Sequence, residues 1–166
     1  RQISYIGNVG CGRVQSLLEI GQALAELDSE ELPGYIDVYS GTKQPEYIDQ
    51  LSQAPGIRFH GAISTEQVLD VMRHSMAVVH AESFDRNMME RVRFSVSTKI
   101  AESLMYGPCL LAYGPEGIAS IDYLKENHAA YVISSMQKLK TGLQEFLKNT
   151  DLRNEILKDA RFLAQK

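Results

Sequence analysis

The chain has 166 residues, of which 44% are hydrophobic and 23% charged, and its formal net charge is −4. This composition fits one globular domain over residues 1–166 that buries most of its apolar surface, and it excludes a disordered chain. The mild acidity argues against a broad basic surface, so we expect no nucleic-acid partner.

Short β-rich runs alternate with amphipathic segments along the chain. The expected elements are strands at Ile3–Ile6, Ile36–Tyr39, Ile57–His60, Ala77–His80, Cys109–Tyr113 and Tyr131–Ile133, and helices at Arg13–Leu27, Pro45–Gln53, Thr65–His74, Ser97–Tyr106, Ile118–Asn127, Leu139–Leu147 and Leu152–Ala164. This alternation predicts an α/β fold, a doubly wound and mostly parallel sheet of about six strands with helices on both faces.

The stretch from Glu82 to Val96 is polar and too long for an ordinary connection, so it is expected to be irregular. It follows the fourth expected strand, which places it over the carboxyl edge of the sheet. Open α/β sheets hold their ligands at that edge.

The first loop at this edge is rich in glycine. Gly7, Gly10 and Gly12 lie between the first strand and the first helix. Glycines let backbone N–H groups approach a phosphate, and the helix N-terminus adds partial positive charge. The spacing G-x-x-G-x-G matches neither the dinucleotide fingerprint nor the Walker loop. A tight strand-to-helix turn without a ligand is an equally good interpretation.

Two cations stand where the helix macrodipole disfavours them. Arg13 and Lys99 are both expected in the first turn of a helix, the second helix beginning near Ser97, whose hydroxyl is a typical N-cap. Each placement costs about a few tenths of a kcal/mol. Either cation alone would be interpreted as a solvated charge. Together, at one edge of the sheet, they predict a shared anion.

Lys99 and Glu102 share one face of the same helix because residues three apart are neighbours. One interpretation is a surface ion pair worth about 0.2–0.5 kcal/mol. The other assigns Lys99, with the N–H groups near Ser97 and Thr98, to phosphate oxygens, and the Glu102 carboxylate to sugar hydroxyls. The local chemistry leaves both open.

The remaining polar groups give weaker signals. The four histidines lack metal-ligand spacing, and neither a metal nor another cofactor is expected. His60 and His80 close the third and fourth strands, where a hydrogen-bonded strand-end histidine is favoured over a ligand contact. No nucleophile elbow or reactive thiolate is present in the sequence. Arg86, Arg91 and Arg93 are interpreted as a solvated loop surface.

The cysteines and the hydropathy of the sequence indicate in which cellular compartment the protein is expected. Cys11 and Cys109 suit reduced thiols in the cytoplasm better than a disulfide scaffold or a thiolate metal site. No apolar run approaches the roughly 20 residues of a membrane span. Because the sequence starts without a signal peptide or an initiator methionine, we expect it to be a piece of a longer chain.

Five segments in chain order resemble the C-terminal, donor-binding domain of retaining GT-B glycosyltransferases (glycosyltransferase group 1). They are YIGNVGCGRVQSLLEIGQAL, IDVYSGT, GIRFHGAISTEQVLDVMRHSMAVVHAE, FSVSTKIAESLMYGPCLLAYG and LRNEILKDARFLAQK. The resemblance spans nearly the whole chain and implies a Rossmann-like domain that binds a nucleotide-sugar donor. It also implies that the acceptor binds to an N-terminal domain absent from this sequence.

The resemblance implies specific roles. Arg13 and Lys99 would act as catalytic groups at the donor diphosphate, Glu102 would hold the ribose, and the backbone around His60 would meet the nucleobase. The implied donor-binding residues are Gly7, Asn8, Gly12, Gly41, Thr42, His60, Gly61, Ile63, Ser97, Thr98 and Glu102. The sequence departs from the family pattern at Asn8, where an arginine is usual, and at Phe94, where the first of two glutamates is usual.

The implied reaction moves a hexose from a nucleotide diphosphate sugar, such as a UDP-sugar, to a saccharide or other acceptor in cell-surface polysaccharide or glycan synthesis. The full-length enzyme is expected in the cytoplasm or peripherally at the inner face of the membrane, and the isolated domain is expected to be inactive. One alternative is a decayed, non-catalytic nucleotide-binding or scaffolding module. Another, a nicotinamide-dependent oxidoreductase, is disfavoured because Ser40-Gly41-Thr42-Lys43 replaces the acidic residue expected after the second strand.

Overall fold

The computed structural model describes residues 2–166. Its elements in chain order are β1 (Gln2–Ile6), α1 (Arg13–Glu26), β2 (Ile36–Tyr39), α2 (Pro45–Gln53), β3 (Ile57–Phe59), α3 (Thr65–His74), β4 (Ser75–Ala81), α4 (Arg86–Val92), α5 (Thr98–Tyr106), β5 (Cys109–Tyr113), α6 (Ala119–Glu126), β6 (Tyr131–Ile133), the short 3₁₀ helix η1 (Met136–Lys138), α7 (Leu139–Lys148) and α8 (Thr150–Ala164). The expected strands and helices are confirmed, and no end is shifted by more than two residues.

The six strands form one parallel sheet in the order β3-β2-β1-β4-β5-β6. The predicted fold class is therefore confirmed. The chain leaves β1 toward β2 and β3 on one side, then returns to add β4, β5 and β6 on the other. In an open α/β sheet the crevice at such a reversal, here between β1 and β4, is the usual place for a ligand.

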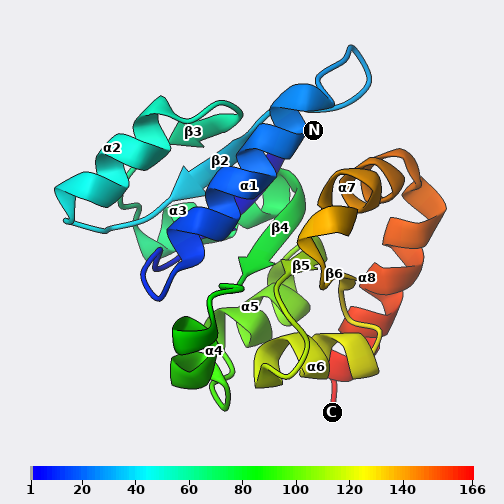
Figure 1. The fold of residues 1–166 in the computed structure, drawn as a ribbon. Coiled ribbons are helices and arrows are strands. Elements are labelled where there is room, and N and C mark those ends of the chain that lie inside the picture. Colours follow the sequence, from blue (N-terminus) through cyan, green and yellow to red (C-terminus); the bar gives the residue numbers. More distant parts are fainter. Residues whose placement is uncertain (1) are drawn as a thin grey trace.

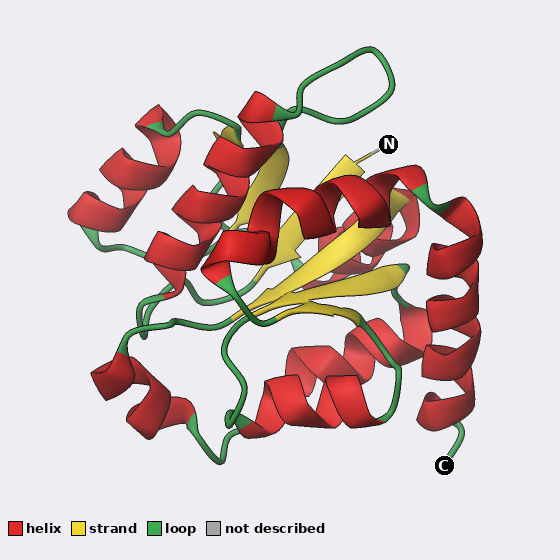
Figure 2. Ribbon diagram, turned by 45° about the vertical axis from the view of Figure 1, so that its right-hand side comes forward, coloured by secondary structure: helices red, strands yellow, loops and turns green. Residues whose placement is uncertain are grey.

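Helices cover both faces of the sheet (Figures 1 and 2). Successive side chains of a strand point to opposite faces, and β4 shows this division. Ala77 and Val79 pack in the apolar cluster that includes side chains of α1, α2 and α7. Val78 packs in the cluster that includes side chains of α3, α5 and α6. The sheet is thus the middle layer between two apolar cores.

The stretch from Glu82 to Val96 is more regular than expected, because it contains the helix α4. The carboxylate of Asp85 caps this helix by accepting hydrogen bonds from the N–H groups of Asn87 and Met88. Val92 is buried and anchors its last turn. A helix of seven residues is too short to give a clear hydrophobic period, which is why the sequence pattern did not predict it.

Two arginines of α8 bind the carboxyl ends of other helices. Arg161 donates to the carbonyl oxygens of Leu104 and Gly107 at the end of α5. Arg153 donates to the carbonyls of Phe146 and Leu147 at the end of α7. The last carbonyls of a helix lack intrahelical partners and carry partial negative charge, so both cations are favourably placed.

Arg161→Met is expected to lower the free energy of unfolding by about 1–2 kcal/mol, because it leaves two part-buried carbonyl groups without their charged donor. Urea denaturation followed by circular dichroism measures the change. The matched control is Lys158→Met on the exposed side of the same helix, which should change stability by less than about 0.5 kcal/mol. Equal effects of the two substitutions would contradict the capping role of Arg161.

Candidate functional site

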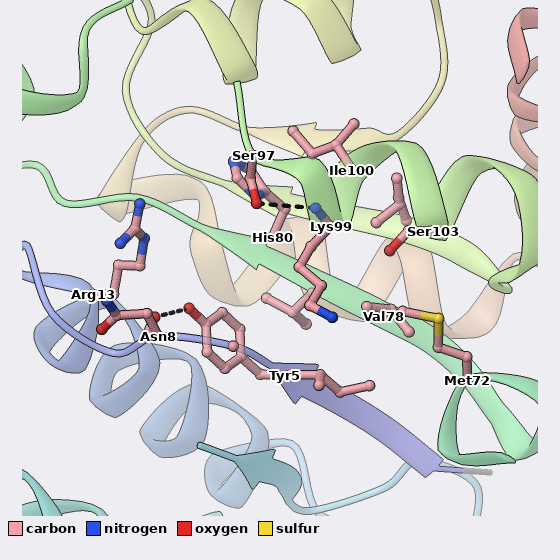
Figure 3. A pocket seen from close by; sticks show the side chains of 14 residues that line it. Tyr5, Asn8, Arg13, Met72, Val78, His80, Ser97, Lys99, Ile100 and Ser103 are labelled. Carbon is pink, nitrogen blue, oxygen red and sulfur yellow. Dashed lines mark hydrogen bonds between the residues drawn. The ribbon is translucent and has the colours of Figure 1, made fainter. Parts of the chain in front are cut away.

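A cavity of about 110 Å³ lies at the carboxyl ends of β1 and β4, at the reversal of strand order. Its wall combines the first loop, β4 and the start of α5 (Figure 3). The lining residues are Tyr5, Ile6, Gly7, Asn8, Arg13, Met72, Val78, Val79, His80, Ser97, Lys99, Ile100, Ser103 and Leu110. Polar side chains and apolar ones therefore share one hollow at the edge where the sequence predicted a ligand.

Arg13 reaches the cavity from the first residue of α1. The preceding residue, Gly12, has φ +77°, and a Cβ on it would lie 2.5 Å from the Oγ of Ser83. Glycine thus lets the first loop approach the segment that follows β4. The Arg13 guanidinium lies 3.1 Å from the Oε1 of Glu82, and the two side chains are 17% and 3% exposed.

Glu82 is a functional candidate that the sequence analysis missed. It follows β4 directly, and the hydroxyl of Ser16 donates to its backbone carbonyl. The Oε2 atom is buried and has no hydrogen-bond partner in residues 2–166. Burial raises the pKa of the Glu82 carboxyl, and the charge of Arg13 opposes that rise. In the sequence, the signal that could have identified Glu82 is a glutamate directly after an apolar strand.

His80 lies beside this ion pair. Its Nε2 is 3.0 Å from the Oγ of Ser120 and 3.5 Å from the Oε1 of Glu82. Burial, helped by the positive charge of Arg13, lowers the pKa of His80 to about 4. His80 is therefore neutral near neutral pH, and its hydrogen bond confirms the expected role of a strand-end histidine.

Lys99 enters the cavity from the first turn of α5 (Figure 3). The Ser97 hydroxyl accepts a hydrogen bond from the Lys99 N–H, which confirms Ser97 as the N-cap. The Nζ of Lys99 lies 3.0 Å from the Oε2 of Glu102, and the side chains are 42% and 48% exposed. Because such an exposed pair is worth only about 0.3–0.5 kcal/mol, an anion can displace Glu102 at small cost.

The structure brings together only some of the predicted site residues. Gly7, Asn8, Arg13, Ser97 and Lys99 line the cavity. Gly12 and Thr98 adjoin these residues in the chain, and Glu102 pairs with Lys99, but none of the three lines the cavity. Gly41, Thr42, His60, Gly61 and Ile63 lie after β2 and β3, outside it. The roles predicted for all of them remain predictions.

The two departures from the family pattern have distinct surroundings. Asn8 shapes the first loop, because its Oδ1 accepts from the Gly10 N–H at 2.7 Å and its carbonyl accepts from the Tyr5 hydroxyl. Phe94 is 85% exposed and does not line the cavity. Neither residue supplies the charge that the family usually has at its position.

His60 is also a hydrogen-bonded strand-end histidine. Its Nε2 lies 2.6 Å from the Oδ1 of Asp37, and its ring stacks on Tyr39 with 4.6 Å between the centroids. Contact between a nucleobase and the backbone of the loop after His60 stays a prediction.

Residues 2–166 contain neither a cluster of metal-ligating side chains nor a membrane-spanning helix. No three histidine, cysteine, aspartate or glutamate side chains among them are grouped so that they could hold a metal ion. No helix in the same range is both long and apolar enough to cross a bilayer.

Comparisons with known proteins concern the family and the fold. Residues 21–166 match the family described as "Glycosyl transferase-like". The fold is similar to the crystal structure of WaaG, a glycosyltransferase involved in lipopolysaccharide biosynthesis, with a TM-score of 0.72 and 15% sequence identity over 100% of this chain and 43% of that one. It is also similar to AviGT4, a glycosyltransferase involved in avilamycin A biosynthesis, with a TM-score of 0.67 and 13% identity over 99% of this chain and 48% of that one.

The chain thus spans less than half the length of either structural relative. No curated protein matches it in sequence.

Arg13→Met is expected to lower the free energy of unfolding by about 2–3 kcal/mol at neutral pH, because it leaves Glu82 buried without a counter-charge. Without Arg13 the folded pKa of Glu82 stands further above its unfolded value. The loss should therefore be smaller at about pH 5 than at neutral pH, because a protonated Glu82 needs no counter-charge, and it should grow as the pH rises through the folded pKa. Chemical denaturation at both pH values measures it.

Lys99→Met is the matched comparison, because it removes the other cation of the cavity from an exposed ion pair. It should change stability by less than about 0.5 kcal/mol at either pH. Equal losses of unfolding free energy for the two substitutions would contradict the idea that the buried pair depends more strongly on its cation than the exposed pair does.

Proposed function

Because the chain belongs to the glycosyl transferase-like family, we propose that it is the donor-binding domain of a GT-B enzyme that transfers a sugar from a nucleotide diphosphate sugar. The observation that carries this proposal is the presence of two cations, Arg13 and Lys99, from separate helices in one cavity at the reversal of the sheet. The acceptor, a saccharide or another hydroxyl compound, would bind to an N-terminal domain outside this chain.

The size of the cavity suits part of such a donor. At about 110 Å³ it is smaller than the roughly 300–1,000 Å³ of pockets that enclose a drug-sized ligand. In this proposal the cavity takes the diphosphate, and the nucleoside extends along the sheet edge. The backbone around Gly61 and Ile63 would then meet the base, and Glu102 would release Lys99 and accept hydrogen bonds from the ribose hydroxyls.

The two cations would also contribute to the reaction. When the bond between the sugar and the diphosphate breaks, its electron pair goes to the departing diphosphate oxygen. Arg13 and Lys99 would stabilise that added negative charge more strongly in the transition state than in the ground state. Positive side chains would thus act on the leaving group, and the proposal includes neither a metal ion nor another cofactor.

We extend the proposal to hexose transfer from a UDP-sugar in polysaccharide or glycan synthesis, in the cytoplasm or peripherally at the inner membrane face. One structural relative is a glycosyltransferase of lipopolysaccharide biosynthesis, which supports this pathway class. The competing proposal is a non-catalytic binding or scaffolding module. The exposure of Phe94 outside the cavity and the engagement of Arg13 by Glu82 favour that alternative.

Thermal shift across UDP, GDP, ADP and their sugar conjugates tests donor binding, because a ligand that binds only the folded state raises the melting temperature. We expect one nucleotide series to stabilise the chain, and Lys99→Met to weaken its affinity by about tenfold through the loss of a charge-assisted contact.

The control is Lys125→Met, since Lys125 also forms an exposed ion pair with a glutamate but lies outside the cavity. It should leave the affinity unchanged. If none of the nucleotides binds, the non-catalytic module becomes the better proposal.

The isolated chain is expected to transfer no sugar and to show no hydrolysis of the bound donor above background. In this proposal its residues form the donor site, and the acceptor site lies in another domain. Product analysis of the chain incubated with the stabilising donor and a mixture of simple saccharides measures this. Turnover would contradict the assignment of the acceptor site to another domain.

A further inference from the structure

Glu82 is a buried carboxylate that uses only part of its hydrogen-bonding capacity. Its side chain is 3% exposed, and its Oε1 accepts a hydrogen bond from Arg13 at 3.1 Å. Its Oε2 is buried and has no partner within residues 2–166. A buried carboxylate normally has donors for both oxygens, because each unsatisfied oxygen loses its hydration without replacement. The charged form of Glu82 therefore depends on a single guanidinium.

This inference rests on the proposed function, in which Arg13 binds the donor diphosphate. We propose that Glu82 is a positioning residue that competes with the diphosphate for Arg13 and takes up one proton on Oε2 when the diphosphate binds. The proton comes from solvent and converts the carboxylate to a neutral carboxylic acid, with no other bond made or broken. Oε2 is the atom that can accept it without losing an existing hydrogen bond.

The groups around Glu82 support this assignment. The titratable side chains that face it are Arg13 from α1, His80 from β4 and Tyr5 from β1. Burial lowers the pKa of His80 to about 4 and raises that of the Tyr5 phenol, so both are neutral near neutral pH. Among these described neighbours, Arg13 alone offers a positive charge.

An anion that engages Arg13 therefore weakens the one interaction that favours the charged form of Glu82. Burial already raises the pKa of this carboxyl, and a bound dianion beside Arg13 raises it further. Protonation and anion binding then favour each other. The affinity for the anion should increase as the pH falls, by at most about tenfold per pH unit for one linked proton.

Sulfate is the probe of choice, because it stays a dianion across the relevant pH range and carries neither base nor sugar. Amide shifts of the 166-residue chain, followed by NMR, report its dissociation constant. We expect sulfate to bind about three- to tenfold more tightly at about pH 5.5 than at about pH 7.5. Glu82→Gln should bind sulfate equally at both pH values, with an affinity at least that of the wild type at the lower one.

The matched control is Glu102→Gln, which neutralises the carboxylate paired with Lys99, the other cation of the cavity. It should keep the pH dependence of the wild type. A Glu82→Gln chain that retains that dependence, or that binds sulfate more weakly than the wild type at every pH, overturns the competition. Absence of sulfate binding by the wild type at both pH values overturns it as well.

A second measurement needs no substitution at Glu82 and covers the case in which Glu82→Gln fails to fold. The carbon-13 shift of the Glu82 carboxyl is titrated with pH, with and without sulfate. We expect sulfate to raise the midpoint, and an unchanged midpoint overturns the proposal. If sulfate behaves as expected while no nucleotide binds, the proposed donor specificity fails and the role of Glu82 stands.

Discussion

The ion pair between Arg13 and Glu82 is the interaction around which the candidate site is built. It joins the start of α1 to the residue after β4, so it spans the place where the order of the strands reverses. A buried pair of this kind gives little net stability, since desolvation of the two charges offsets their attraction. Its value to the molecule is positional: it keeps a guanidinium at the wall of the cavity.

The second cation is held in the opposite manner. Lys99 is half-exposed, pairs with a half-exposed Glu102 and stands on the first turn of a capped helix. One cation is thus paired with a buried carboxylate, and the other with an exposed carboxylate that it can leave at small cost. In the proposed donor site, the buried pair would orient Arg13, and the exchangeable contact of Lys99 would allow the ligand to leave.

The layered fold could be predicted from the sequence because strands and helices alternate with clear periods, and α5 could be placed through its Ser97 cap. α4 could not, because its seven residues depend on the Asp85 cap and on one buried valine instead of a repeated pattern. In the site, the expectation that Arg13 and Lys99 meet one hollow agrees with the geometry. The role of Glu82 could not be anticipated, since it depends on a contact between residues 69 positions apart and on an oxygen without a partner.

The arginines of α8 have a consequence for how the chain loses its structure. Arg153 binds the end of α7 on one face of the sheet, and Arg161 binds the end of α5 on the other. One C-terminal segment thereby couples both apolar layers, so neither layer can open without breaking contacts to a helix that the other also uses. The domain should consequently melt as one cooperative unit, and fraying of α8 would loosen both sides of the sheet together.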